Sequence, residues 1–256
     1  MVTRKYGWKP DVPDHRDHLF KVSAPMALPP SVNLQRWCGP VEDQKALGSC
    51  TANSIAGLLQ YDRIKEGKAD QSLPSRLFIY WNERHMEGTV GSDSGAMIRD
   101  GIKSLHRWGF CDESLWPYSD DTTSAHPPFI QKPSAAAFAA AKREIVTNYA
   151  RVPQTAVGIK TCLALGFPVV FGFSVYESFE SPEVAKTGIV PMPGPNEQML
   201  GGHAVMCCGY DDATQHFLVR NSWGPGWGQA GYFQLPYQFM LNPNLADDFW
   251  TVRFVP

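Results

Sequence analysis

The spacing of apolar residues changes near residue 125, and this change constrains the fold more than any other feature. Before it, apolar residues recur at helical intervals over 50–67, 72–86 and 94–108. After it, helices are expected over 135–141 and 155–165 and strands over 144–152, 169–175, 203–210, 215–221, 231–235 and 249–254. We therefore predict an α+β fold with a mainly helical lobe and an antiparallel, β-barrel-like lobe, separated by a cleft.

This pattern divides the chain into three parts. Residues 1–30 mix proline, charge and histidine without a period and end in the proline-rich run 24–30, so we expect an extended arm. Residues 31–125 should form the helical lobe, and residues 126–256 should form the β-rich lobe.

Composition narrows the possible partners. The net charge of −2 provides no electrostatic footprint for nucleic acid or for an anionic membrane. The first ten residues lack the apolar core of a secretory signal. The longest apolar run, 167–173, falls far short of the about 20 residues that span a bilayer. We expect a monomer, and the compartment stays undecided.

The cysteines are too sparse for a disulfide-stapled scaffold, since only six occur among 256 residues. Cys207 and Cys208 are adjacent on an apolar strand and are expected to be buried thiols. A bridge among Cys38, Cys111 and Cys162 is the alternative to free thiols there. The group His15, Asp17 and His18 suggests solvated side chains rather than metal ligands.

Cys50 follows a Gly-Ser turn at the start of a predicted helix. The partial positive charge of a helix N-terminus stabilises a thiolate, which is the nucleophilic form of cysteine. A lone cysteine in such a place is more often a small buried hydrophobe, so its surroundings must decide.

Three other polar residues supply such surroundings. The amide of Gln44, six residues before Cys50, could form an oxyanion hole with the Cys50 backbone N–H. His203 follows two glycines, which let its ring approach another segment closely. The carbonyl of Asn221 could orient His203, and Trp223 could shield that hydrogen bond from water.

These residues lie in segments that resemble the papain-like cysteine peptidases. The segments are QKALGSCTA over 44–52, GHAVMCCGY over 202–210 and NSWGPGWGQAGY over 221–232, in the family order Cys, His, Asn. The resemblance runs from about Leu28 to Pro256. It implies a papain-like two-lobed fold and a cysteine endopeptidase without metal or cofactor, in which Cys50, His203, Asn221 and Gln44 are catalytic.

The resemblance also implies where substrate binds. Gly91–Gly95 resembles the loop that pairs with extended substrate backbone, with Ser94 and Gly95 at the pairing positions. Ala96, Met97, Gly172 and Ala204 would line the second subsite, and an apolar side chain is expected there. Gly202, Trp223 and Trp227 complete the predicted substrate-binding set, with the two tryptophans at the rim of the cleft.

Some positions depart from the family pattern. Thr51 replaces the usual aromatic residue after the nucleophile, and Leu47 and Ser92 replace a pair of bridged cysteines. The arm is too short for the family's long helical prosegment, yet 30 extended residues can reach about 100 Å and could lie along the cleft. Acyl transfer to an amine by the same residues, as in a ligase, is an alternative reaction. A non-catalytic binding protein on this scaffold is an alternative of another class.

Overall fold

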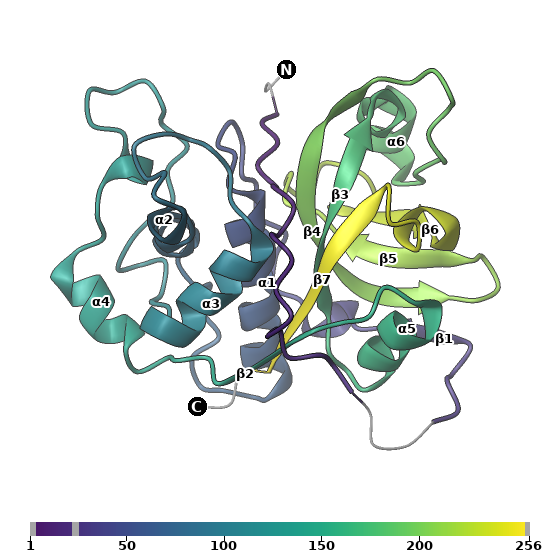
Figure 1. Cartoon of the computed structure of the whole chain (residues 1–256), viewed down its shortest axis with the longest axis horizontal. Coiled ribbons are helices and arrows are strands. Elements are labelled where there is room, and N and C mark those ends of the chain that lie inside the picture. The colour runs from purple at the N-terminus through teal and green to yellow at the C-terminus, as the bar shows by residue number, and fades with distance from the viewer. Residues whose placement is uncertain (1–3, 22–25, 254–256) are drawn as a thin grey trace.

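The computed structural model describes residues 4–21 and 26–253 and confirms the α+β fold. Figure 1 shows a helical lobe beside a curled sheet, with the chain from residue 4 onward running between them. The helices are α1 (Cys50–Lys65), α2 (Arg76–Glu87), α3 (Ile98–Trp108), α4 (Ala135–Ala141), α5 (Ala156–Ala164), α6 (Pro182–Thr187) and α7 (Tyr237–Met240).

Helix α1 is the centre of the molecule, because it packs on α2 and α3 and also on strands β3 and β4 of the sheet. Every residue from Cys50 to Arg63 is buried, as expected of a helix enclosed on all sides. The capping of α2 explains its limits: Ser75 accepts a hydrogen bond from the backbone N–H of Phe78, and Gly88 ends the helix in the left-handed region at φ 72°.

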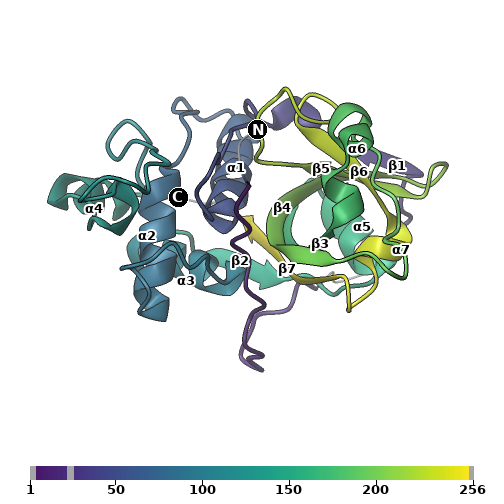
Figure 2. The ribbon, with the colours of Figure 1, turned by 90° about the horizontal axis from the view of Figure 1, so that it is seen from above.

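The strands form one sheet with the order β2-β7-β3-β4-β5-β6, and β1 pairs with β4 outside this path. They are β1 (Ser31–Asn33), β2 (Asn148–Arg151), β3 (Val169–Tyr176), β4 (Met199–Asp211), β5 (His216–Arg220), β6 (Tyr232–Pro236) and β7 (Ala246–Arg253). All the pairings between these strands are antiparallel. Seen from above in Figure 2, the sheet curls through β3, β4 and β5, and α5 lies beside it.

Two elements lie across the expected boundary between the lobes. Strand β1 falls in the range 31–125 but pairs with β4 of the sheet. Helix α4 falls in the range 126–256 but packs against α2, where Phe138 meets Phe78 with ring centroids 4.9 Å apart. The crossover between the lobes therefore comes after α4 and not at residue 125.

The third helix begins later than its apolar pattern predicts, at Ile98 instead of Ser94. Gly95 has a φ of 68°, and Met97 is extended at φ −88° and ψ 137°. Between them, Ala96 forms a β-bridge with Trp8 of the arm. The backbone before Ile98 thus pairs with a distant segment and cannot join the helix.

The described part of the arm makes a turn at residues 14–17, where the Asp17 N–H donates to the Asp14 carbonyl, and two isolated bridges, Trp8 to Ala96 and Leu19 to Arg151. We call residues 4–9 the site segment and residues 11–20 the clamp segment. Residues 1–3 and 22–25 of the expected arm lie outside the described residues. All six cysteines fall within the described part and are free, so no bridge joins Cys38, Cys111 and Cys162. No helix of the described part is long and apolar enough to cross a membrane.

Candidate active site

Cys50 is the first residue of α1 and is fully buried. Burial raises the pKa of its thiol to about 11, although the nearby backbone N–H groups of Ala204 and Gly7 oppose this effect. Ala204 directly follows His203 on β4, so the sulfur lies against the strand that carries the histidine. Gly7 belongs to the site segment, so the arm itself contacts the sulfur.

His203 and Asn221 are joined as the sequence predicts. His203 Nε2 lies 2.8 Å from Asn221 Oδ1, which also accepts a hydrogen bond from the backbone N–H of Ser222. Because an amide oxygen only accepts, Nε2 carries the hydrogen and Nδ1 keeps its lone pair. Nδ1 makes no hydrogen bond to any described residue. Trp223 stacks on the imidazole at 5.1 Å and 28°, which covers the bond to Asn221.

The electrostatics of this arrangement favour uncharged groups. His203 is fully buried, and burial lowers its pKa to about 4 despite the hydrogen bond to Asn221. The raised pKa of Cys50 acts in the same direction. With the site segment in place, a neutral thiol and a neutral imidazole are therefore the stable forms near pH 7.

Gln44 is held in the loop before α1 by two bonds to one serine. Its Oε1 accepts from Ser222 Oγ at 2.6 Å, and its backbone N–H donates to the carbonyl of Ser222 at 2.9 Å. Its Nε2 donates to the carbonyls of Leu47 at 3.1 Å and Lys5 at 3.3 Å. The amide of Gln44 thus already donates to a peptide carbonyl of the arm, and it could donate equally to a carbonyl of another peptide.

The site segment forms hydrogen bonds with both lobes. Ala96 donates to the Gly7 carbonyl at 2.8 Å, and Lys9 donates to the Ala96 carbonyl at 3.0 Å. From the other side, Trp8 donates to the carbonyl of Gly202 at 2.9 Å. The chain passes so close to the loop before α1 that a Cβ on Gly7 would lie 1.8 Å from the carbonyl oxygen of Gly48. Only glycine fits at position 7.

The predicted backbone-pairing residues do not pair with the arm. Ser94 donates its hydroxyl to Thr89 Oγ1 at 2.9 Å, and Gly95 donates its N–H to the Tyr80 hydroxyl at 3.1 Å. The arm pairs instead with Ala96, one residue further along. The shift follows from the left-handed backbone at Gly95, which turns the chain just before Ala96.

The predicted subsite residues differ in what they contact. Ala96 pairs with the site segment, and Gly172 faces the Trp8 ring so closely that a Cβ there would lie 1.9 Å away. The Met97 amide donates to Glu87 Oε1 at 2.7 Å. Trp227 packs edge-on against Trp223 with ring centroids 5.1 Å apart. The Trp8 side chain therefore fills the space above Gly172.

A family model described as "Papain family cysteine protease" matches residues 28–245. The chain belongs to the papain family. Xylellain, a cysteine protease from Xylella fastidiosa, has a solved structure that is 45% identical, with a TM-score of 0.92, covering 100% of this chain and 99% of that one. The family assignment makes this chain a cysteine-type peptidase, a hydrolase whose substrates are peptides or proteins.

Two curated relatives extend the comparison. An uncharacterized peptidase C1-like protein of Acanthamoeba polyphaga mimivirus is 40% identical over 99% of this chain and 88% of its own length. A gut-specific cysteine proteinase of Caenorhabditis elegans is 35% identical over 76% of this chain. The match covers 63% of that relative's length.

Sequence reasoning missed two groups of residues in this papain-family site. Ser222 fixes Gln44, and its position directly after Asn221 was the available signal. The second group is a set of acidic residues that contact the arm: Asp43, Glu87, Asp93 and Glu180. These four residues lie far apart in the sequence and follow no period, so no local pattern could have identified them as one group.

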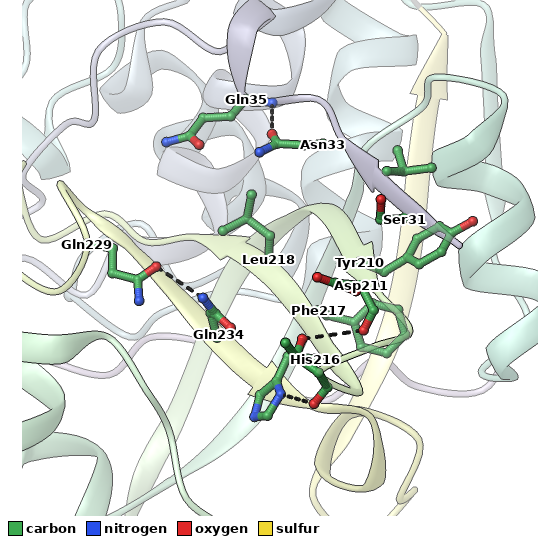
Figure 3. Close-up of a pocket in the computed structure, with 12 residues that line it drawn as sticks. Ser31, Asn33, Gln35, Tyr210, Asp211, His216, Phe217, Leu218, Gln229 and Gln234 are labelled. Atoms are coloured by element: carbon green, nitrogen blue, oxygen red, sulfur yellow. Dashed lines mark hydrogen bonds between the residues drawn. The ribbon is translucent and has the colours of Figure 1, made fainter. Parts of the chain in front are cut away.

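A separate depression of about 380 Å³ lies between β1, β4, β5 and β6 and contains none of the predicted site residues (Figure 3). Several of its polar side chains are hydrogen-bonded within the protein: Asn33 Oδ1 accepts from the backbone N–H of Gln35, and Gln234 Nε2 donates to Gln229 Oε1. Nothing in this depression bears on the peptidase chemistry.

Proposed function

We propose that this papain-family peptidase cleaves bonds within extended peptides, with Cys50 as nucleophile and His203, Asn221 and Gln44 as its partners. One observation carries the proposal. The Cys50 sulfur, at the N-terminus of α1, lies close to the backbone N–H of Ala204, which directly follows a His203 whose Nε2 is hydrogen-bonded to Asn221. That arrangement leaves the free lone pair of Nδ1 for a proton from the thiol. The proposed enzyme works as a monomer and without a cofactor.

The proposed reaction begins when His203 takes the thiol proton and the thiolate attacks the carbonyl carbon of the substrate. The carbonyl oxygen becomes an oxyanion, which accepts hydrogen bonds from Gln44 Nε2 and from the Cys50 backbone N–H. Collapse of this intermediate breaks the C–N bond, and the imidazolium gives its proton to the leaving amine. A thioester then joins the acyl group to Cys50.

Water completes the cycle. His203 removes a proton from water, the resulting hydroxide attacks the thioester, and the thiolate leaves. The carboxylic acid product departs and the Cys50–His203 pair is restored. An amine in place of water would give a new amide, the ligase reaction, and no contact in the structure favours that outcome over hydrolysis.

We further propose that the site segment restrains the enzyme from within the chain. Its support is the contact of Gly7 with the Cys50 sulfur and of the Lys5 carbonyl with Gln44 Nε2. Tyr6 adds an edge-on contact with His203 at 6.2 Å. These contacts occupy the groups that substrate needs, and the burial they cause disfavours the thiolate–imidazolium pair.

Substitution of the nucleophile tests the proposed reaction. Cys50→Ala should abolish both peptide hydrolysis and labelling by a peptidyl epoxide, with unchanged circular dichroism. Cys38→Ala is the matched control, because Cys38 is a partly exposed thiol outside the site. Undiminished hydrolysis in the Cys50→Ala protein would refute the proposal, and products made with an added amine would separate ligase from hydrolase.

A further inference from the structure

Side chains of the site segment alternate between the two lobes, as they do along any extended strand. Lys5 and Lys9 face the helical lobe, where their ammonium groups pair with Asp93 at 2.7 Å and with Glu87. Tyr6 and Trp8 face the β-rich lobe, where Tyr6 bonds Glu180 and Trp8 covers Gly172. The surface under the arm thus presents two carboxylates on the helical side and, on the β-rich side, space for aromatic rings together with the carboxylate of Glu180.

The two carboxylates of the helical lobe are positioned by the body of the protein and not by the arm. Asp93 accepts from the backbone N–H of Gly48 at 3.1 Å and from the Tyr80 hydroxyl. Glu87 accepts from the backbone N–H of Met97 at 2.7 Å. These bonds do not involve the arm, so the carboxylates would keep their places if the site segment left.

Both carboxylates are also nearly removed from solvent, with side-chain exposures of 5% for Asp93 and 4% for Glu87. A buried carboxylate is costly unless a cation or several hydrogen bonds compensate it. The lysines of the arm supply cations here, beside the buried guanidinium of Arg84, which attracts both carboxylates. A peptide that displaced the arm without bringing a cation would leave Asp93 and Glu87 without these two ammonium groups.

We infer that Asp93 and Glu87 determine specificity and direct this peptidase to extended basic peptides. The preferred substrate carries lysine or arginine at positions whose side chains point to the helical lobe. In the arm the two lysines are four residues apart, a separation of about 13 Å along an extended strand. This inference rests on the proposed function and adds the chemical class of its substrate.

A competing explanation is that the ion pairs Lys5–Asp93 and Lys9–Glu87 only stabilise the closed position of the arm. A competition experiment on the full chain separates the two. Pairs of fluorogenic peptides, identical except for lysine or norleucine at one of six positions around the cleaved bond, are mixed in one reaction. The ratio of their consumption rates equals the ratio of kcat/KM, and the fraction of enzyme with an open arm cancels from that ratio.

We expect a preference of about tenfold for lysine at one or more positions, decreasing in 0.5 M NaCl. Glu87→Gln and Asp93→Asn should each reduce the preference at a different position to within about twofold. Glu66→Gln is the control for charge, because Glu66 is exposed and follows the C-terminal end of α1, about 24 Å from Cys50. This control should keep the full preference.

Two results would overturn the inference. The first is that the wild type consumes the lysine and norleucine peptides at the same rate. The second is that both variants keep the wild-type rate ratios but cleave every peptide faster, which would mean that the ion pairs of Asp93 and Glu87 only hold the arm in place. If the full chain cleaves none of the peptides, the same comparison is made from epoxide labelling rates, with lysine or norleucine in the epoxide. Absence of both cleavage and Cys50 labelling would refute the proposed function itself, an outcome distinct from activity without a lysine preference.

Discussion

The site segment and the clamp segment are neighbours in one arm, yet they contact the body in opposite ways. The site segment brings lysines to carboxylates that the body already bonds. The clamp segment brings carboxylates to the buried Arg99, whose side chain donates its hydrogen bonds to the arm. Arg99 is 5% exposed and donates to Asp17 and to the carbonyl of Val12.

The clamp segment also joins the two lobes. Asp17 pairs with Arg99 of α3 and lies 3.6 Å from Arg151 of β2. Asp11 accepts from the Arg99 backbone at 3.0 Å and from Trp250 of β7 at 2.8 Å. Loss of the site segment would expose the proposed catalytic groups. Loss of the clamp segment would leave the buried guanidinium of Arg99 without its hydrogen-bond acceptors. The comparison indicates that the site segment can regulate access to the active site and that the clamp segment stabilises the fold.

The largest effect should come from removing the clamp carboxylate. Asp17→Ala removes the carboxylate that the Arg99 side chain hydrogen-bonds, and breaking a buried pair in this way costs about 3–5 kcal/mol. Urea denaturation measures the loss. His15→Ala, at an exposed residue of the same segment, is the matched control and should leave the midpoint unchanged. Equal stability of the two variants would remove the structural role of the clamp.

A smaller effect should follow from forcing the site segment away. Gly7→Ala places a methyl group against the Gly48 carbonyl, and overpacking of this kind costs about 1–3 kcal/mol. Labelling of Cys50 by a peptidyl epoxide should accelerate roughly five- to hundredfold while the urea midpoint changes little, because the clamp stays bound. Gly194→Ala is the control, since its added Cβ meets only ordinary contacts. Unchanged labelling in Gly7→Ala would contradict the restraint.

The titration of His203 should distinguish the two states of the arm. Burial holds its pKa near 4 in the full chain, below the unfolded value of about 6.5, so the closed arm loses stability as the pH falls through this window. Gly7→Ala should raise the pKa of His203 by exposing the ring to solvent. Histidine chemical shifts measured between pH 4 and pH 8 follow this change, and coincident curves would show that the arm does not bury the ring in solution.

The stability that the contacts around the clamp segment contribute should depend on pH in the opposite sense. Asp248 faces Asp11, Asp247 and Arg151, and burial with the nearby Asp11 charge raises its pKa to about 7. The folded chain then binds a proton that the unfolded chain releases above pH 4, so stability falls as the pH rises from about 4 to 7. Asp248→Asn should reduce this fall by about 2 kcal/mol between pH 5 and pH 7 in urea denaturation. A parallel pH dependence in both proteins would contradict it.

The sequence predicted the parts of the fold that local patterns determine. The change in the spacing of apolar residues separated helices from strands, and three motifs pointed to Cys50, His203 and Asn221 as candidate site residues. The path of the arm escaped prediction because it depends on pairings across the chain, such as Trp8 with Ala96. Asp17 was expected to be solvated, which is wrong, since its side chain is 5% exposed. Its partner, Arg99, is 82 residues away.

The clamp also bears on where the folding unit of this peptidase begins. The family match starts at residue 28, after both segments of the arm. A protein trimmed to that border would keep Arg99 and Trp250 but lose Asp11 and Asp17, which are their hydrogen-bond acceptors. The border at which sequences can be aligned is therefore not the border at which the chain is self-sufficient, and expression trials of shortened forms should retain the residues from Asp11 onward.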